Sequence, residues 1–207
     1  MNKTTSITLI TLAWLSGAWP AQAASTVDLG VSGRITPSAC EVGLSNGGLY
    51  DLGKVASRDL NADQTTPLPI HRLQLTISCE ALTLVALEPR DNRLGSGYGV
   101  DQPYKFGLGL THTNQKLGYM TLRLLAIVAD GRDMQPIAKT GEATWAPTAI
   151  LSHHTLTAFH AGSSAPTPIQ RLDADVEITP TLAPANTLPL ETQVPIDGFM
   201  TLTMTYL

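Results

Sequence analysis

Apolar and polar residues alternate with a period of two at both ends of the chain. In residues 196–207 one face carries large apolar side chains while threonines occupy the other face. Residues 27–35 follow the same rule, with apolar residues separated by polar residues and glycine. This alternation is typical of half-buried β-strands. The apolar positions are Val27, Leu29, Val31 and Ile35 near the start, around Gly33, and Met200, Leu202, Met204 and Tyr206 near the end.

The central part of the chain contains further short segments of strand character. Turn-forming Gly, Pro, Asn and Asp residues separate them, and residues 171–179 alternate most regularly, with Leu172, Ala174, Val176 and Ile178 directed inward. Residues 117–128 come nearest to a helical pattern, but Gly118 and the Thr, Ile and Val content favour a strand, with a short helix as the alternative. Strands at this spacing predict an antiparallel β-sandwich. The other predicted segments are residues 48–55, 70–79, 82–87, 104–110 and 119–129.

The last strand has no following sequence that could form a hairpin with it. Its backbone edge therefore needs a partner from an earlier segment or from another molecule. Unpaired edges promote association with other chains unless they are protected. We expect this strand to be central to function.

Residues 1–23 have the features of a secretory signal. Lys3 precedes an apolar core, and Ala21 and Ala23 satisfy the small-residue cleavage rule. The apolar run is too short to span a bilayer. Removal of Lys3 takes the formal net charge from −4 to −5, and this mild acidity does not fit a nucleic-acid partner, which requires a basic face. The chain is expected to be exported, with one domain after the signal.

Both cysteines, Cys40 and Cys79, lie in the exported part of the chain. Export places them where thiols oxidise, so the sequence favours a single disulfide. Two unpaired buried thiols are the alternative. A metal site at these cysteines would need nearby histidine or carboxylate ligands, and the spacing provides none.

Four motifs, in this order, resemble the pilin subunits of chaperone-usher fimbriae. They resemble more closely a pilin-like family of unknown function that includes GltF-like proteins. The motifs are VSGRITPSAC at residues 31–40, LYDLGKV at 49–55, LTISC at 75–79 and the penultimate Tyr206. The resemblance covers both ends of the chain and only weakly residues 90–170. Those subunits usually carry a glycine further from the C-terminus, which would fall near Val194. This chain has Gly198 instead.

The resemblance implies an immunoglobulin-like antiparallel β-sandwich that lacks its final strand. Residues 24–36 would form an N-terminal extension and residues 37–207 the sandwich domain. A periplasmic chaperone would pair with the C-terminal strand, at Met200, Leu202, Met204, Tyr206 and Leu207. At an outer-membrane usher, the extension of the next subunit would replace the chaperone, with Val27, Leu29, Val31, Gly33 and Ile35 as donor-strand residues.

A structural subunit of a surface fimbria, assembled by donor-strand exchange, is therefore the predicted function. The alternative is a self-complemented, non-polymerising secreted binding module, in which residues 25–35 fold back to close their own sandwich and the middle loops bind a ligand. A sugar-binding tip adhesin is less favoured because Trp145 is the only tryptophan after the signal.

No residue pattern indicates an enzyme, a cofactor or a metal centre. His153, His154 and His160 have no acidic residue at a suitable spacing, so they are interpreted as surface histidines. Asp173, Asp175 and Glu177 are interpreted as the solvent face of a strand and not as a calcium site. The glycine-rich segments do not open a helix, and Ser96 does not lie in a nucleophile elbow.

Overall fold

A computed structural model describes residues 30–32 and 39–207. The chain divides into two units, residues 1–35 and 36–207. In the first unit the described residues, 30–32, have no regular secondary structure. Of the predicted donor-strand residues, Val27, Leu29, Gly33 and Ile35 lie outside the described residues.

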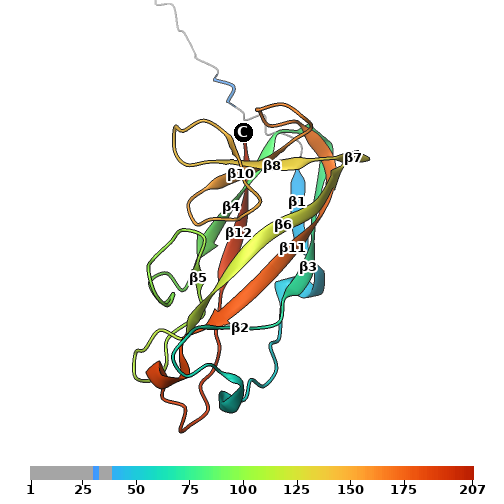
Figure 1. Ribbon diagram of the computed structural model, residues 1–207. Coiled ribbons are helices and arrows are strands. Elements are labelled where there is room, and N and C mark those ends of the chain that lie inside the picture. The colour runs from blue at the N-terminus through green and yellow to red at the C-terminus, as the bar shows by residue number, and fades with distance from the viewer. Residues whose placement is uncertain (1–29, 33–38) are drawn as a thin grey trace, which may run out of the picture. The chain divides into compact units, whose positions relative to one another are not determined.

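The second unit is an antiparallel β-sandwich of two sheets (Figure 1). The larger sheet has the strand order β1-β3-β11-β6-β5, with β2 paired to β11 and β7 paired to β6. It contains β1 (Cys40–Leu44), β2 (Thr66–Pro67), β3 (His71–Thr83), β5 (Phe106–Gly107), β6 (Gly118–Ala129), β7 (Arg132–Asp133) and β11 (Ile169–Leu182).

The smaller sheet has the strand order β12-β4-β10-β8-β9. Its strands are β4 (Val85–Asp91), β8 (Gln135–Lys139), β9 (Ala146–Pro147), β10 (Leu156–His160) and β12 (Met200–Tyr206). Short 3₁₀ turns complete the described structure: η1 (Ser45–Gly48), η2 (Ser57–Asp59) and η3 (Ala185–Thr187). The predicted all-β sandwich is confirmed, and the segment over residues 117–128 is a strand.

The core between the sheets follows from alternation along the long strands. In β11, Leu172, Ala174, Val176 and Ile178 are all buried, as predicted. Leu75 and Ile77 of β3 pack into the same cluster, which also contains Leu87 of β4, Phe159 of β10 and Leu124 of β6. Because the two inner faces interdigitate, one continuous apolar cluster holds the sheets together.

A disulfide joins the first strand of the sandwich to its neighbour. Cys40 and Cys79 face each other in the β1–β3 register, and their Sγ atoms are 2.02 Å apart. The predicted disulfide is thereby confirmed. Closing a loop of 39 residues restricts the unfolded chain and stabilises the fold by about 4 kcal/mol in the chain-entropy treatment.

Several predicted strand limits are wrong. Residues 49–56 contain no strand. Leu52 and Val55 instead pack in a second apolar cluster, around Leu108 and Leu182, so their burial does not depend on sheet pairing. The segment predicted over residues 104–110 forms a strand only at Phe106–Gly107, and β3 extends to Thr83, so that β4 begins at Val85.

Candidate functional site

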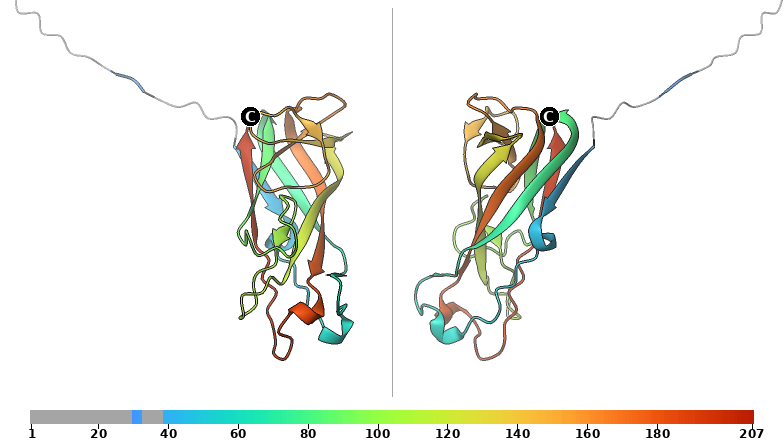
Figure 2. Two further views of the ribbon diagram at one scale, coloured as in Figure 1. Left: turned by 60° about the vertical axis from the view of Figure 1, so that its left-hand side comes forward. Right: turned by 90° about the vertical axis from the view of Figure 1, so that its right-hand side faces the viewer.

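The two longest edge strands of the sandwich, β1 and β12, lie on the same side of it. β1 ends the larger sheet and β12 ends the smaller one. Both views of Figure 2 place them side by side, and the backbone N–H of Cys40 donates to the Tyr206 hydroxyl at 3.1 Å. We call this pair of edges the β1–β12 side. At the opposite ends of the two sheets, β5 and β9 have only two residues each.

Within the described part of the chain, the C-terminal strand β12 pairs along only one of its two edges. β12 runs antiparallel to β4 from Met200↔Asp91 to Tyr206↔Val85. Just outside the strand, Asn92 N–H donates to Phe199 and Leu207 N–H donates to Leu84. Since bonding alternates along an antiparallel strand, the odd-numbered residues of β12 bind β4 and the even-numbered residues turn their backbone groups to the other edge.

The outward backbone groups of β12 therefore belong to Tyr206 and, before it, to the three residues Met200, Leu202 and Met204. Among the described residues no strand other than β4 pairs with β12. The side chains of the same three residues point inward and pack against the core, yet each remains only half-buried. Half-burial of inward-facing apolar side chains leaves room for further apolar contact along this edge.

The same arrangement occurs across the sandwich at β1. The carbonyl of Ala39 accepts a hydrogen bond from Glu80 N–H, so the odd-numbered residues of β1 bond to β3. The backbone N–H and C=O of Val42 therefore point away from β3. Val42 and Leu44 pack against the core but are half-buried, while Glu41 and Gly43 are exposed. The β1–β12 side therefore offers backbone groups at two edges and half-buried apolar side chains from both sheets.

The predicted residues of the C-terminal strand are thus brought together, with one difference in role. Met200, Leu202 and Met204 face the core, whereas the Tyr206 side chain is 40% exposed and its hydroxyl accepts a hydrogen bond from β1. Leu207 is 44% exposed, and its N–H donates to the carbonyl of Leu84, directly before β4. Sequence reasoning missed Val42 and Leu44, although alternation with Glu41 and Gly43 directly after Cys40 was the signal that could have identified them.

His153, His154 and His160 lie just before β10 or at its end in the chain. Among the residues that the structure describes, no group of three or more His, Cys, Asp or Glu side chains is placed to hold a metal ion. The His153 and His154 rings are in contact, with centroids 3.7 Å apart. His160 lies at the end of β10, where its Nδ1 accepts a hydrogen bond from Gly162 N–H.

His153 is an anchor within the fold. Its Nδ1 accepts a hydrogen bond from Asp91 N–H at 3.1 Å, and its own N–H donates to Pro103. Burial lowers the pKa of His153, and the charge of His154 lowers it further, whereas the carboxylate of Asp91 acts in the opposite direction. The Asp91 carboxylate in turn accepts the N–H groups of Arg93 and Gly107.

The acidic face of β11 is engaged in ion pairs. Arg72 binds Glu177 at 2.8 Å, and Arg171 binds Asp173 at 3.0 Å. Arg72 and Arg171 are exposed, so these pairs contribute little to stability. The described part of the chain contains no helix long and apolar enough to cross a membrane.

Comparisons with known proteins agree with part of this interpretation. A family described as "Protein of unknown function (DUF1120)" matches residues 29–104. The uncharacterised protein YhcF of Escherichia coli K12 is 25% identical over 228 residues, covering 92% of this chain and 94% of YhcF. Protein GltF of the same organism is 28% identical over 138 residues, covering 56% of this chain and 54% of GltF. The chain is therefore similar to GltF-like proteins.

Proposed function

We propose that this protein is a structural subunit of a chaperone-usher fimbria or fimbria-like surface fibre, assembled by donor-strand exchange. The observation that carries the proposal is the β1–β12 side, where two edge strands of opposite sheets present half-buried apolar side chains together. One inserted strand would pair with backbone groups at these edges and cover the apolar side chains. This is recognition by strand addition, in which main-chain hydrogen bonds supply affinity and alternate side chains supply specificity.

The alternating segment near the N-terminus supplies the proposed inserted strand. Val27, Leu29, Val31 and Ile35 would enter the β1–β12 side of a neighbouring subunit, and Gly33 would occupy a position without room for a larger side chain. At about 1.5–3 kcal/mol for each buried apolar side chain, four of them supply roughly 6–12 kcal/mol before backbone pairing. Such a joint would be long-lived.

Before assembly, the proposed partner is a periplasmic chaperone that lends a strand to the same edges. Unpaired backbone groups and exposed apolar surface promote aggregation, which a temporary strand would prevent. The outer-membrane usher would then exchange this strand for the extension of the next subunit. The proposed location is the cell surface, reached through the periplasm by way of the signal at residues 1–23.

Removal of the extension tests the proposal. A chain lacking residues 24–36, with its signal intact, is expected to lose the SDS-resistant ladders of assembled subunits while still co-purifying with its chaperone. A matched pair refines the test, because Val31→Asp changes a proposed inserted side chain and Ser32→Asp changes its neighbour on the opposite face. Val31→Asp should remove the ladder and Ser32→Asp should retain it.

The competing function is a self-complemented secreted binding module. In that case the full-length protein, purified without any chaperone, would remain a stable monomer, and residues 25–35 would close its own β1–β12 side. Deletion of residues 24–36 would then lower the melting temperature of a monomer instead of removing a ladder. Either result would contradict the fimbrial proposal.

A further inference from the structure

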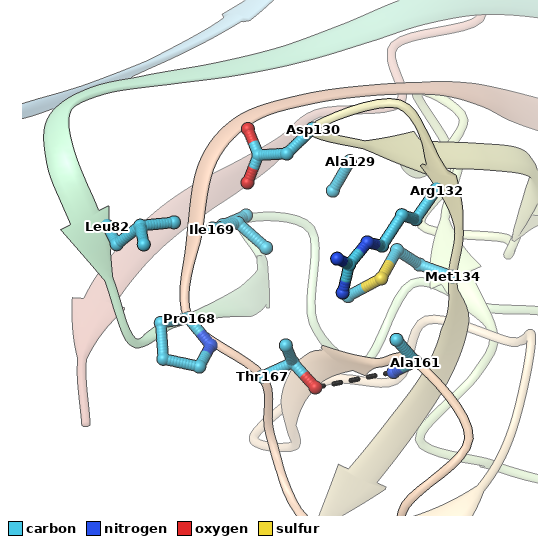
Figure 3. A pocket seen from close by; sticks show the side chains of 9 residues that line it. All are labelled: Leu82, Ala129, Asp130, Arg132, Met134, Ala161, Thr167, Pro168 and Ile169. Atoms are coloured by element: carbon cyan, nitrogen blue, oxygen red, sulfur yellow. Dashed lines mark hydrogen bonds between the residues drawn. The ribbon is translucent and has the colours of Figure 1, made fainter.

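A cavity of about 410 Å³ lies at one end of the sandwich, apart from the residues of the β1–β12 side. It is open to solvent and is bordered by the β6–β7 hairpin, the end of β3 and the segment that joins β10 to β11 (Figure 3). Its size falls within the range of about 300–1,000 Å³ found for small-molecule sites. The lining residues are Leu82, Ala129, Asp130, Arg132, Met134, Ala161, Thr167, Pro168 and Ile169.

The inner wall of the cavity is apolar and fixed. Ile169, Ala129 and Met134 are at most 4% exposed and belong to the main core cluster. Pro168 adds a rigid apolar surface, and the Leu82 side chain lies at the mouth with 67% of its surface exposed. An exposed leucine beside an apolar wall provides a surface that a nonpolar ligand would cover.

The side chains of the two charged residues in the cavity differ in their hydrogen bonding. The Asp130 carboxylate accepts hydrogen bonds from Arg171 N–H at 2.8 Å and Gln170 N–H at 3.0 Å. The Arg132 backbone pairs with Ala129 in the β6–β7 ladder, whereas its guanidinium has no hydrogen bond or ion pair with any described residue. Figure 3 shows its guanidinium beside Met134 and turned toward the space that Ile169, Pro168 and Thr167 border.

Thr167 adds a second polar group on the opposite wall. Its hydroxyl oxygen accepts a hydrogen bond from Ala161 N–H at 3.3 Å, which fixes the side chain and leaves the O–H available to donate. The cavity therefore combines an apolar wall with a guanidinium, one hydroxyl donor and the Asp130 carboxylate, both of whose oxygens already accept backbone N–H groups. A guanidinium presents paired N–H groups that match a carboxylate in a bidentate geometry.

We infer that this cavity binds a small monocarboxylate whose apolar body is a short alkyl chain. The carboxylate would pair with Arg132 and accept from the Thr167 hydroxyl. The apolar body would cover Leu82 and Pro168, above the buried side chains of Met134 and Ile169. The site is independent of the proposed strand exchange, because it uses no residue of β1 or β12. It would give an exported subunit a capacity to bind organic acids of this class.

The methionine methyl groups allow a direct test. The full-length exported protein, labelled with ¹³C at its methionine methyls, would be titrated with octanoate at neutral pH and followed by NMR. The Met134 methyl signal is expected to shift in a saturable manner, while Met200 and Met204 serve as reporters of the β1–β12 side. Octanamide, which has the same chain without the charge, should bind at least about tenfold more weakly.

Variants separate the charge of Arg132 from general effects. Arg132→Gln should weaken octanoate binding about tenfold or more, and Arg132→Lys should recover part of the loss because it keeps the charge without the bidentate geometry. Arg123→Gln is the matched control, since it removes an exposed charge from β6 outside the cavity. It should bind octanoate as the unmodified protein does.

Three outcomes would overturn the inference. Equal binding of octanamide and octanoate would remove the role assigned to Arg132. Shifts at Met200 and Met204 without a shift at Met134 would place the ligand at the β1–β12 side. Tighter binding of a peptide ending in Thr-Tyr-Leu with a free carboxylate would assign the cavity to the C-terminus of a second copy. None of these outcomes bears on whether subunits assemble by strand exchange.

Discussion

His153 links three segments of the sandwich through a single side chain and its backbone. Its ring nitrogen Nδ1 accepts from the last residue of β4, Asp91, and its N–H binds Pro103. The other ring nitrogen, Nε2, is buried without a partner among the described residues. Protonation of this imidazole would remove the acceptor at Nδ1 and would give the buried ring a positive charge. The fold therefore favours the neutral ring.

This arrangement makes stability depend on pH in a defined direction. Because the pKa of His153 is lowered in the folded state, the unfolded chain binds the proton more readily. The contribution is therefore fully present above the unfolded pKa of about 6.5 and is lost as pH falls from there toward the folded pKa. The free energy of unfolding should decline over this range.

The measurement is urea unfolding at a series of pH values between about 7.5 and 5. His153→Asn supplies an acceptor near the position of Nδ1 but cannot titrate, so its free energy of unfolding should decline less than that of the unmodified protein. His112→Asn is the control, because His112 is exposed. Identical pH dependence in the His153 variant and the unmodified protein would contradict the assignment.

At the residue scale the sequence identifies candidates better than roles. The disulfide partners were predictable because the sequence predicts export and contains only two cysteines. The role of His153 was not, because its hydrogen-bond acceptor function depends on Asp91, which is 62 positions away in the chain. Spacing along the sequence carries no information about such a contact until the strands are paired.

At the scale of elements, neighbouring residues of β12 face opposite sides of the smaller sheet. Leu202 points inward from the β1–β12 side, whereas Thr203 is exposed on the other face. A strand inserted at this side would therefore contact Leu202 and leave Thr203 in solvent. The two residues form a matched pair within one strand.

Alanine substitutions in β12 test this assignment. A chain lacking residues 24–36 would be titrated with a peptide of residues 25–36, and binding measured by calorimetry. Leu202→Ala should weaken peptide binding by about 10- to 100-fold, since it removes part of a buried apolar contact. Thr203→Ala should change the affinity little. Equal effects of the two substitutions would contradict insertion of the peptide beside β12.

Alternation predicted β11 and β12, which have one solvent-exposed face, and missed β8 and β10, which are buried on both faces. β11 and β12 were evident because their outer faces carry polar residues. β8 and β10 each bury three consecutive residues, since Ile137 and Ala158 pack beneath Trp145 on the outer face of the smaller sheet. Burial on both faces removes the period of two that identifies a strand.

The strand predicted at residues 48–55 was wrong because its apolar residues are buried without belonging to a sheet. Its apolar residues are buried by other loops, with Leu52 and Val55 in the cluster around Leu108 and Leu182. Tyr50 stacks on His71 with ring centroids 4.0 Å apart, and its hydroxyl donates to Pro69. A periodic apolar pattern indicates which residues are buried. Residues buried between loops and residues buried in a sheet can show the same pattern, so the pattern alone does not distinguish the two.

At the scale of the whole molecule, the proposed inserted strand and its receiving edges are different surfaces. Residues 27–35 would be the donor, and β1 with β12 would be the acceptor. A contact between unlike surfaces is heterologous, so a linked pair of subunits retains one free donor at one end and one free acceptor at the other. Such contacts extend into fibres unless the geometry closes a ring.

If subunits assemble as proposed, moving the donor segment to the other end of the chain should convert an assembling subunit into a closed monomer. In this variant residues 24–36 are removed from their normal place and residues 25–36 follow Leu207 through a flexible linker. The appended strand would occupy the β1–β12 side of its own molecule. Four buried apolar side chains, at roughly 6–12 kcal/mol in total, should raise the melting temperature well above that of the truncated chain.

The control carries the same linker and segment with Val31→Asp and Ile35→Asp, which places charges where apolar side chains should be buried. Size-exclusion chromatography should show a monomer for the unmodified fusion, without SDS-resistant ladders, and thermal unfolding should separate it from the control. A fusion that melts with its charged control would mean that the β1–β12 side does not receive this segment. Because fusion and control share length and linker, a difference between them measures apolar insertion and not chain extension.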